Sequence, residues 1–344
     1  AVRRYAAMGP QQAVGSLVHY TGTSSLSQAP ENIFDPRDQI RALRGAGDLN
    51  RRQALADLRK QMRGSILSMQ EWWLNRMLAT PAPLQEKMTL FLHGHFTTAA
   101  IQKGVWPPYV WQQNQLYRNA ALGNLRNLSL AVSQDPAMLL YLDNAASAKA
   151  HPNENYAREL MELFTLGHGN YSEEDIRQSA RAFTGWTIDR RTGEFIFRPA
   201  MHDDGTKTFL GRSGNFDGRD IVGIIYEQPA CAAFWAKSLL NQFVYNDPEQ
   251  QLIDALASVI RKNDYELAPV ISTIFQSNVF FSSRAYRALV KSPVEFVIGT
   301  HAALGLSQIE PGSLGALKQM GQILFYPPDV AGWPGGGNWI TSQT

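Results

Sequence analysis

The sequence contains a single cysteine, Cys231, among its 344 residues. An intramolecular disulfide and a zinc site made of several thiolates are therefore excluded. The neighbouring alanines indicate that Cys231 is a small buried residue and not a nucleophile. No apolar run approaches the roughly 20 residues that a membrane-spanning helix requires. Basic and acidic residues nearly balance, with a formal net charge of +2, so the composition indicates no nucleic-acid partner.

The motifs of several common enzyme classes are also missing. The sequence has neither a phosphate-cradling Gly-x-Gly-x-x-Gly after a strand nor a Walker loop. It also lacks the Gly-x-Ser-x-Gly nucleophile turn and the His-Glu-x-x-His zinc motif. Any chemistry in this chain would therefore depend on Glu, Asp and His side chains, with Trp and Tyr shaping the site.

The hydrophobic pattern predicts a mainly α protein. Apolar residues recur at helical spacing along most of the chain, including 38–62 and 65–78, which we expect to form separate helices. Two alternating segments, 186–188 and 194–197, flank a turn and predict a small β-hairpin insertion near 186–198. The predicted fold class is therefore a multi-helix single globular fold with this hairpin inserted.

The N-terminal region differs from the rest in composition. Residues 1–36 mix short apolar groups with Gly and Ser, and we expect an irregular segment there, with one or two short helices and an irregular stretch around 21–30. Residues 37–344 are expected to form one helical domain, with 200–217 as a candidate internal boundary.

A helix expected over 153–167 concentrates polar side chains on one face. Asn153 is a candidate N-cap and Gly167 a candidate C-cap. At about 100° per residue, one arc of the helix carries Glu154, Asn155, Arg158, Glu159 and Glu162, while apolar residues fill the other side. Spacing alone favours a solvated face with a Glu154–Arg158 pair at i,i+4. The alternative is that the arc lines an internal polar site.

Two other segments carry histidines. A buried helix expected over 84–100 contains His93-Gly94-His95, and Gly94 would permit close approach by another segment. The two imidazoles point about 200° apart on a helix, so they cannot both face one site. We interpret one of them as a buried, hydrogen-bonded structural residue. His202 and Asp203 follow the hairpin in a loop, a setting typical of functional residues and of ordinary loops alike.

Several of these stretches, together and in this order, resemble the bacterial DUF1800 family. The matching motifs are FLHGHF at 91–96, NENYAREL at 153–160, AFTGW at 182–186, His202-Asp203 before Lys207-Thr208, KSPVEF at 291–296 and DVAGWP at 329–334. The resemblance covers roughly 72–341 and implies little about activity, since the family's function is unassigned. It favours the internal-site interpretation of the 153–167 helix, because polar motifs from distant segments are typical of a pocket.

The resemblance also implies a location outside the cytoplasm. Members are exported, often with a cleavable signal peptide, and tend to be encoded beside a second exported family, which would supply a protein partner. The chain begins with Ala1 and not Met, so we expect that a targeting segment has been removed. The expected location is periplasmic or secreted.

The first functional hypothesis is a hydrolase or lyase that acts on a cell-surface or exported polysaccharide. Paired carboxylates are the minimal machinery for glycoside cleavage. The candidate catalytic residues are Glu154, Glu159, His95, His202 and Asp203. The candidate substrate-binding residues are Asn153, Asn155, Arg158, Trp106, Trp111, Trp186 and Trp333. This hypothesis needs no cofactor and takes a carbohydrate polymer as the partner.

Two alternatives remain open. The chain could be a non-catalytic structural or binding component of a cell-envelope assembly, in which the polar arc braces neighbouring helices. It could also be a metal-dependent enzyme that binds a divalent metal through His and carboxylate ligands. The candidate ligands would be His93 or His95, Glu154, Glu159, His202 and Asp203.

Overall fold

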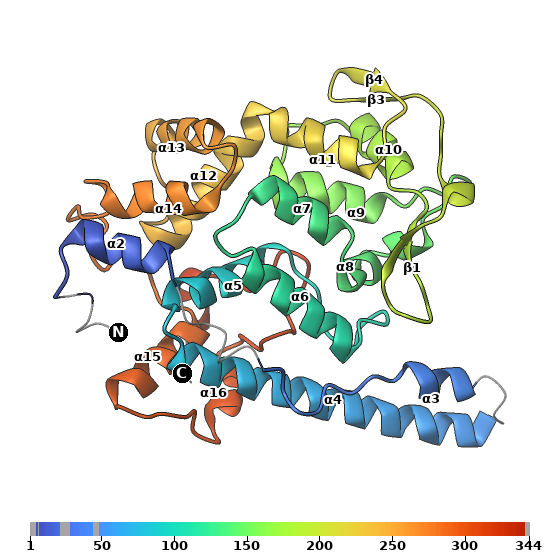
Figure 1. Cartoon of the computed structure of the whole chain (residues 1–344), viewed down its shortest axis with the longest axis horizontal. Helices are drawn as coiled ribbons and strands as arrows, with labels where there is room; N and C mark the ends of the chain where they lie inside the picture. The colour runs from blue at the N-terminus through green and yellow to red at the C-terminus, as the bar shows by residue number, and fades with distance from the viewer. Residues whose placement is uncertain (1–4, 6, 21–27, 44–47, 341–344) are drawn as a thin grey trace.

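The computed structural model describes residues 5, 7–20, 28–43 and 48–340. In these residues the protein has fifteen α-helices and two small two-stranded antiparallel sheets, which confirms the predicted mainly α fold (Figure 1). The first helices are α2 (Pro10–Val18), α3 (Arg37–Ala42), α4 (Asp48–Ala79), α5 (Pro83–His95), α6 (Pro107–Asn119), α7 (Leu125–Ser133), α8 (Pro136–Tyr141) and α9 (Glu154–Glu159). The others are α10 (Glu173–Ala182), α11 (Gly218–Glu227), α12 (Pro229–Phe243), α13 (Gln250–Lys262), α14 (Leu267–Gln276), α15 (Pro293–Ala303) and α16 (Ser313–Gln319).

The remaining elements are short. Three 3-10 turns and one π-helix interrupt the chain at η3 (Asn144–Ala146), η4 (Leu160–Thr165, the π-helix), η5 (Pro199–Met201) and η6 (Gly336–Trp339). The strands are β1 (Trp186–Ile188), β2 (Phe195–Phe197), β3 (Lys207–Phe209) and β4 (Arg212–Gly214). None of the described helices has both the length and the apolar character that crossing a membrane requires.

Local sequence signals explain where many of the helices begin. The Ser172 hydroxyl accepts a hydrogen bond from the backbone N–H of Asp175, and the Asp175 carboxylate accepts one from the backbone N–H of Ser172. These two bonds form the capping box that starts α10. Ser292 and Glu295 make the same reciprocal pair at the start of α15. Each box satisfies two backbone donors that a helix N-terminus otherwise leaves without partners.

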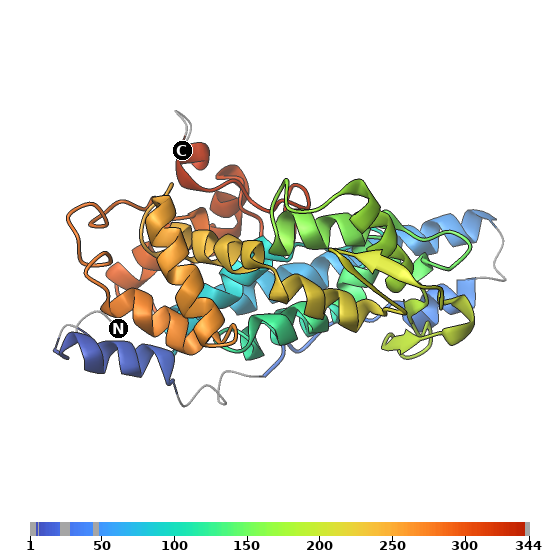
Figure 2. The ribbon, with the colours of Figure 1, turned by 90° about the horizontal axis from the view of Figure 1, so that it is seen from above.

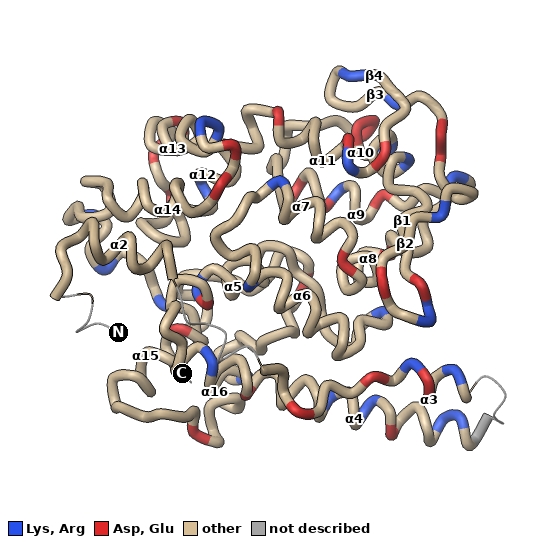
Figure 3. The backbone as a smooth tube through the Cα atoms, in the orientation of Figure 1, with Lys and Arg blue, Asp and Glu red and all other residues tan. Residues whose placement is uncertain are grey.

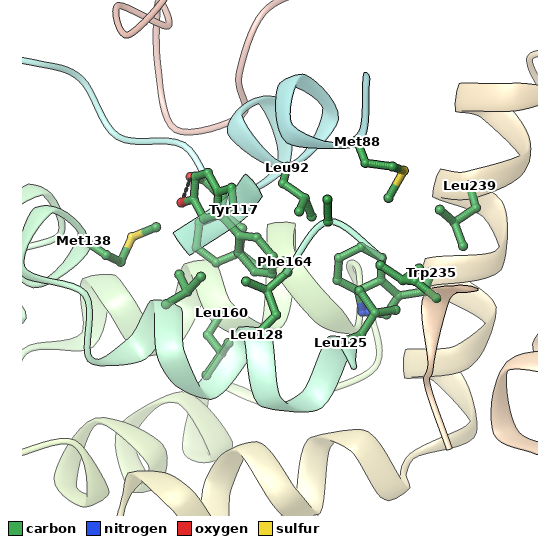
Figure 4. Close-up of a cluster of buried hydrophobic side chains, with 14 of the residues drawn as sticks. Met88, Leu92, Tyr117, Leu125, Leu128, Met138, Leu160, Phe164, Trp235 and Leu239 are labelled. Carbon is green, nitrogen blue, oxygen red and sulfur yellow. Dashed lines mark hydrogen bonds between the residues drawn. The ribbon is translucent and has the colours of Figure 1, made fainter. Parts of the chain in front are cut away.

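Helix α5 contributes several side chains to the buried core. Met88 and Leu92 of this helix are fully buried. Figure 4 shows them near Phe164 of the π-helix and Trp235 of α12. Burying one such side chain stabilises the fold by about 1.5–3 kcal/mol. Segments separated by more than a hundred residues are therefore held together around the helix that carries His93 and His95.

The long helix α4 corrects one expectation. Separate helices were predicted over 38–62 and 65–78, but 48–79 form one continuous helix along one edge of the molecule, preceded by α3 (Figures 1 and 2). Gly64 lies inside it, and a Cβ added there would meet no atom within 4 Å. An isolated glycine costs a helix about 1 kcal/mol and does not by itself end it.

The predicted hairpin is present, and a second one follows it. β1 pairs with β2 in the register Trp186 to Phe197. β3 and β4 form a further hairpin that the sequence reading did not identify, with Lys207 opposite Gly214. Its turn places Leu210 and Gly211 at positive φ. Its second strand, with the sequence Arg-Ser-Gly, lacks the β-branched and aromatic residues that marked the first hairpin.

The N-terminal region contributes one helix to the core. α2 lies within the segment that was expected to hold short helices, and its Val14 and Val18 are buried. It contacts α14 and α5. Most of the stretch expected to be irregular, 21–30, lies outside the described residues.

Candidate functional site

Three of the motif segments meet at one cleft, which we call the motif cleft. It consists of two adjoining hollows of about 510 and 230 Å³ that share wall residues. The C-terminal end of α5, the start of α15, the loop at 333–336 and one face of α12 line it. Its principal polar and aromatic residues are Lys87, Phe91, His95, Asn241, Gln242, Asn246, Lys291, Ser292, Glu295, Trp333 and Trp339.

Two glycines allow the loop at 329–334 to lie directly on α5. Gly332 has φ +90°, and a Cβ there would lie 2.4 Å from the carbonyl oxygen of Gly94. A Cβ on Gly94 would lie 3.9 Å from the ring of Trp333. The hydroxyl of Thr97 donates to the carbonyl of Val330 and fixes the same contact. The close approach predicted at Gly94 is therefore made by this loop.

His95 lies where the cleft meets the core. Its Nε2 is 2.8 Å from the carbonyl oxygen of Phe164, so Nε2 carries the proton and donates. The other nitrogen, Nδ1, then holds a lone pair in the neutral ring. The ring packs 4.3 Å from Trp235. Burial lowers the pKa of His95 to about 4, with the bond to Phe164 acting in the opposite direction, so the imidazole is neutral at physiological pH.

His93 points to different neighbours and has a structural role. Its Nε2 is 3.0 Å from the amide nitrogen of Asn114, and its ring lies 4.7 Å from Tyr117. Burial, with a further contribution from Arg118, lowers its pKa well below the usual range. His93 therefore belongs to the buried network beneath α5, while His95 faces the motif cleft.

The helix that carries the polar arc is not a continuous α-helix, which corrects the prediction for 153–167. It begins as expected, with the Asn153 side chain accepting the N–H of Asn155 at 2.9 Å. It ends before Gly167, which has φ +76°. Between them, Leu160–Thr165 is a π-helix in which Leu166 N–H bonds to Met161 O. The arc calculated at about 100° per residue therefore applies only to Glu154–Glu159.

The π-helix is linked to His95. Carbonyl groups in the last turn of a helix have no partner within the helix, and the carbonyl of Phe164 is used by His95. π-helical turns occur frequently at functional sites. The imidazole thus holds the end of the polar helix against α5.

The cleft contains one ion pair and two buried polar atoms without partners. Lys87 pairs with Glu295. Burial raises the pKa of Glu295, but the charge and hydrogen bond of Lys87 and the capping bonds of Ser292 outweigh it, so the net pKa is lowered. Asn241 Oδ1 and Trp333 Nε1 are buried and have no hydrogen-bond partner among the described residues.

Four predicted residues at the start of the polar helix lie outside this cleft. Arg158 donates to both oxygens of Glu173 at 2.8 and 2.9 Å and to Glu154 at 3.4 Å. The Glu154 side chain is 41% exposed, and Asn155 is exposed as well. The amide of Asn153 donates to Asp143 O at 3.0 Å. These contacts are those of a capped helix start with a solvated ion-pair network.

Glu159 is in a different environment. It is half-buried, and burial, followed by the nearby charge of Glu162, raises its pKa while Arg158 opposes the shift. Burial and the charges of Asp329 and Glu159 together raise the pKa of Tyr141. Glu159 therefore lies in electrostatic range of the same phenol as Asp329, the first residue of the DVAGWP loop.

His202 and Asp203 belong to a separate cluster near the hairpins. His202 is 5% exposed, and its Nδ1 donates to Thr184 O at 2.9 Å. Asp203 accepts from Arg181 at 2.7 and 3.0 Å, and this hydrogen bonding lowers its pKa to about 2. The buried Lys207 donates to the carbonyls of Asp203 and Gly205. These bonds close the 202–207 loop. His202 and Asp203 do not line the motif cleft, whereas His95 does.

The predicted tryptophans also divide between locations. Trp333 lines the motif cleft. Trp106 lines a different hollow, Trp111 packs edge-on against Trp72 at 4.8 Å, and Trp186 is 1% exposed in the core. No group of three or more His, Cys, Asp and Glu side chains within the described ranges is arranged to hold a metal ion.

Several residues of the cleft were not predicted from the sequence as site residues. Lys87, Asn241, Gln242 and Trp339 carried no motif signal that distinguished them from surface positions. Glu295 was within reach, because it belongs to the KSPVEF segment that contributed to the family resemblance. That segment was recognised as a match, but its carboxylate was not connected to His95.

Comparison with known proteins identifies a family. A family model described as "Protein of unknown function (DUF1800)" matches residues 1–344, which extends beyond the motif-bearing part of the chain. No curated protein and no solved structure shows significant similarity to this chain. The match spans the entire sequence and agrees with the motifs that surround the cleft. The chain therefore belongs to the DUF1800 family.

Proposed function

We propose that the chain binds a polysaccharide in the motif cleft, as a binding component of a cell-envelope assembly. The observation that carries this proposal is the composition of the cleft wall. Aromatic rings from Phe91, Trp333 and Trp339 stand beside the amides of Asn241 and Gln242. Flat apolar rings suit the faces of sugar rings, and planar amides suit their hydroxyl groups.

The two unsatisfied polar atoms support the same ligand class. Asn241 Oδ1 is an acceptor and Trp333 Nε1 is a donor, and both residues line the cleft. A buried polar group without a partner costs about 1–3 kcal/mol. A hydroxyl group is both a donor and an acceptor, so it can pair with either atom. We expect a ligand with hydroxyl groups along its length to recover this free energy when the two side chains turn toward it.

Binding suits the titratable groups of the cleft better than acid/base catalysis does. Glu295 is held in its ionised form by Lys87 and is the capping-box partner of Ser292 at the start of α15. His95 is neutral, so it can accept a hydrogen bond but does not supply a proton at neutral pH. The cleft thus lacks the protonated acid that glycoside cleavage requires. We expect the ligand to be a cell-surface or exported glycan, and the co-encoded exported protein remains a proposed partner.

The test is glycan binding by the intact chain and by cleft variants. We expect a neutral oligosaccharide from a cell-wall panel to bind in calorimetry, and Trp333→Ala to weaken its Kd by tenfold or more. Trp333→Phe keeps the stacking ring but loses the Nε1 donor, so an intermediate loss is expected. Trp111→Phe, which alters a tryptophan outside the cleft, is the matched control. Absence of any glycan binding, or unchanged Kd in a folded Trp333→Ala variant, would refute the proposal.

A second function, glycoside hydrolysis, is favoured by one observation. The raised pKa of Glu159 makes it a candidate proton donor, and Asp329 lies in range of the same Tyr141 phenol. In that case Glu159→Gln would abolish the release of reducing ends from a polysaccharide, while Glu162→Gln would retain it. Equal activity in both variants, or no release by the unaltered protein, would exclude this function.

A further inference from the structure

We propose that a second groove, beside the first β-hairpin, binds the carboxylate groups of an acidic polysaccharide built from uronic acid units. We call it the hairpin groove. It consists of two hollows of about 220 and 570 Å³ that share Leu140, Ile188 and Arg190. It shares no wall residue with the motif cleft. The proposal extends the proposed function to a charged glycan, but its site is separate.

Three distant segments build the groove. α3 supplies Arg37 and Arg41, the loop before α6 supplies Trp106, and β1 with its turn supplies Arg190. Arg37 donates to the carbonyl of Thr192 at the hairpin turn and so fixes α3 to the hairpin. Figure 1 shows α3 below the hairpin at the same end of the molecule.

The hairpin turn is fitted closely to this surface. Gly193 has φ +80°, and a Cβ there would lie 2.6 Å from Arg37 Nη1 and 2.8 Å from the ring of Tyr109. Only glycine allows this turn to seat against both. The packing of the turn therefore holds the backbone of Arg190 beside the aromatic wall, and the Arg190 side chain is exposed.

The walls of the groove carry more basic than acidic residues. The cations are Arg37, Arg41, Lys103, Arg190 and Arg198, and the acidic residue is Asp143. Around the first hairpin and α3, basic and acidic residues alternate along the backbone (Figure 3). Local carboxylates already occupy the first three of these cations: Arg37 pairs with Asp35, Arg41 with Asp38, and Lys103 with Asp143.

Arg190 and Arg198 remain available for a ligand. Neither guanidinium has an ion-pair or hydrogen-bond partner in the described part of the chain. The nearby Asp189 carboxylate accepts hydrogen bonds from the backbone N–H groups of Arg191 and Thr192, and it lies in electrostatic range of Arg198 without forming an ion pair. Guanidinium groups match carboxylates in a two-point geometry, so two arginines without an ion-pair partner suit a ligand with repeated carboxylates.

An aromatic platform lines the same hollow as Arg190, and Arg198 lines the adjoining hollow. Trp106 is half-buried and stacks on Tyr109 with ring centres 5.8 Å apart and planes 16° apart. Such a rigid flat wall accepts the face of a sugar ring. Nucleic acid is less well matched, because binding it depends on extended phosphate neutralisation and on several stacking rings. An aromatic wall beside Arg190, with Arg198 in the adjoining hollow, is instead the combination that a uronate sugar would use.

The test compares oligogalacturonate with the same oligosaccharide after reduction of its carboxyl groups. We expect the full chain to bind the acidic form, and the double variant Arg190→Gln/Arg198→Gln to weaken the Kd by tenfold or more. Arg191→Gln, an exposed arginine of the same turn that does not line the groove, should bind as the unaltered protein does. Trp106→Ala should also weaken binding.

The outcomes separate this proposal from the proposed function. Trp333→Ala should leave oligogalacturonate binding intact, and failure of neutral glycans to bind would refute only the proposal for the motif cleft. The proposal for the hairpin groove is refuted by absence of oligogalacturonate binding or by equal binding of the reduced form. It is also refuted if the double variant and Arg191→Gln lose affinity equally. Equal or tighter binding of a single-stranded DNA oligonucleotide of the same charge would likewise overturn the ligand assignment.

Discussion

Replacing Asp135 by Asn should remove a pH-dependent loss of stability. Asp135 caps α8, is 5% exposed, and accepts hydrogen bonds from Met138 N–H at 2.9 Å and from the Gln113 amide at 2.7 Å. Burial raises its pKa to about 7, although these hydrogen bonds act in the opposite direction. The folded protein therefore favours the protonated carboxyl.

The direction of the pH dependence follows from how many protons the folded and the unfolded chain bind. Below about pH 4 the carboxyl of Asp135 is protonated in both the unfolded and the folded chain, so it adds no pH dependence. Between about pH 4 and pH 7 the unfolded chain has released this proton and the folded chain retains it, so stability falls as pH rises. A difference of about 3 pKa units corresponds to at most about 4 kcal/mol.

The assay is urea unfolding followed by tryptophan fluorescence at several pH values between 4 and 8. Asn is as good an N-cap as Asp, so the cap of α8 should survive in Asp135→Asn. The stability of the unaltered protein minus that of the variant should fall by up to about 4 kcal/mol from pH 4 to pH 7 and then level off. The value at pH 4 serves as the internal control for the substitution itself. A difference that is flat, or that rises with pH, would refute the reasoning.

The remaining predictions concern buried charge, backbone fit and the 202–207 loop. Glu86→Gln leaves two buried guanidinium groups without their carboxylate and should cost roughly 3–5 kcal/mol in urea unfolding; a loss below about 1 kcal/mol would contradict this. Gly332→Ala should displace its loop from α5 and lower the melting temperature, because its Cβ would lie 2.4 Å from a backbone oxygen. Gly94→Ala, whose Cβ meets its nearest atom at 3.9 Å, should be tolerated, and equal losses in the two would argue against the loop contact. Asp203→Asn should cost on the order of 1 kcal/mol at pH 7 after allowance for partial exposure. Because pairing with Arg181 lowers the Asp203 pKa to about 2, that difference should disappear as pH falls from about 4 to 2, and its persistence at pH 2 would contradict the assignment.

The motif cleft could be predicted from the sequence only in part. The motif FLHGHF indicated that Gly94 permits close approach by another segment, because glycine has no side chain. Which segment approaches it depends on contacts more than two hundred residues away, and no local pattern contains that information. The carboxylate of Glu295 was missed for the same reason, since it lines the same cleft as His95 only in the folded chain.

The ends of the polar helix were predictable from the sequence, but its surroundings were not. Its start at Asn153 and its end before Gly167 were both predicted, because caps are set by residues within a few positions of the helix terminus. Its π-helical turn was not predicted, and neither was the solvated setting of Glu154 and Arg158. Hydrophobic spacing reports that one face is polar, but it does not report whether solvent or a pocket lies opposite.

The sequence by itself determined the mainly α fold, the capped helix starts and the first hairpin, because each depends on propensities and hydrogen bonds within a short stretch of chain. Tertiary structure alone decided which polar residues share a site. Packing around α5 placed His95 with Trp333 and Glu295, and left His202 and Asp203 in a loop of their own. Side chains from distant segments meet where the core holds their helices, and that geometry is a property of the assembled chain.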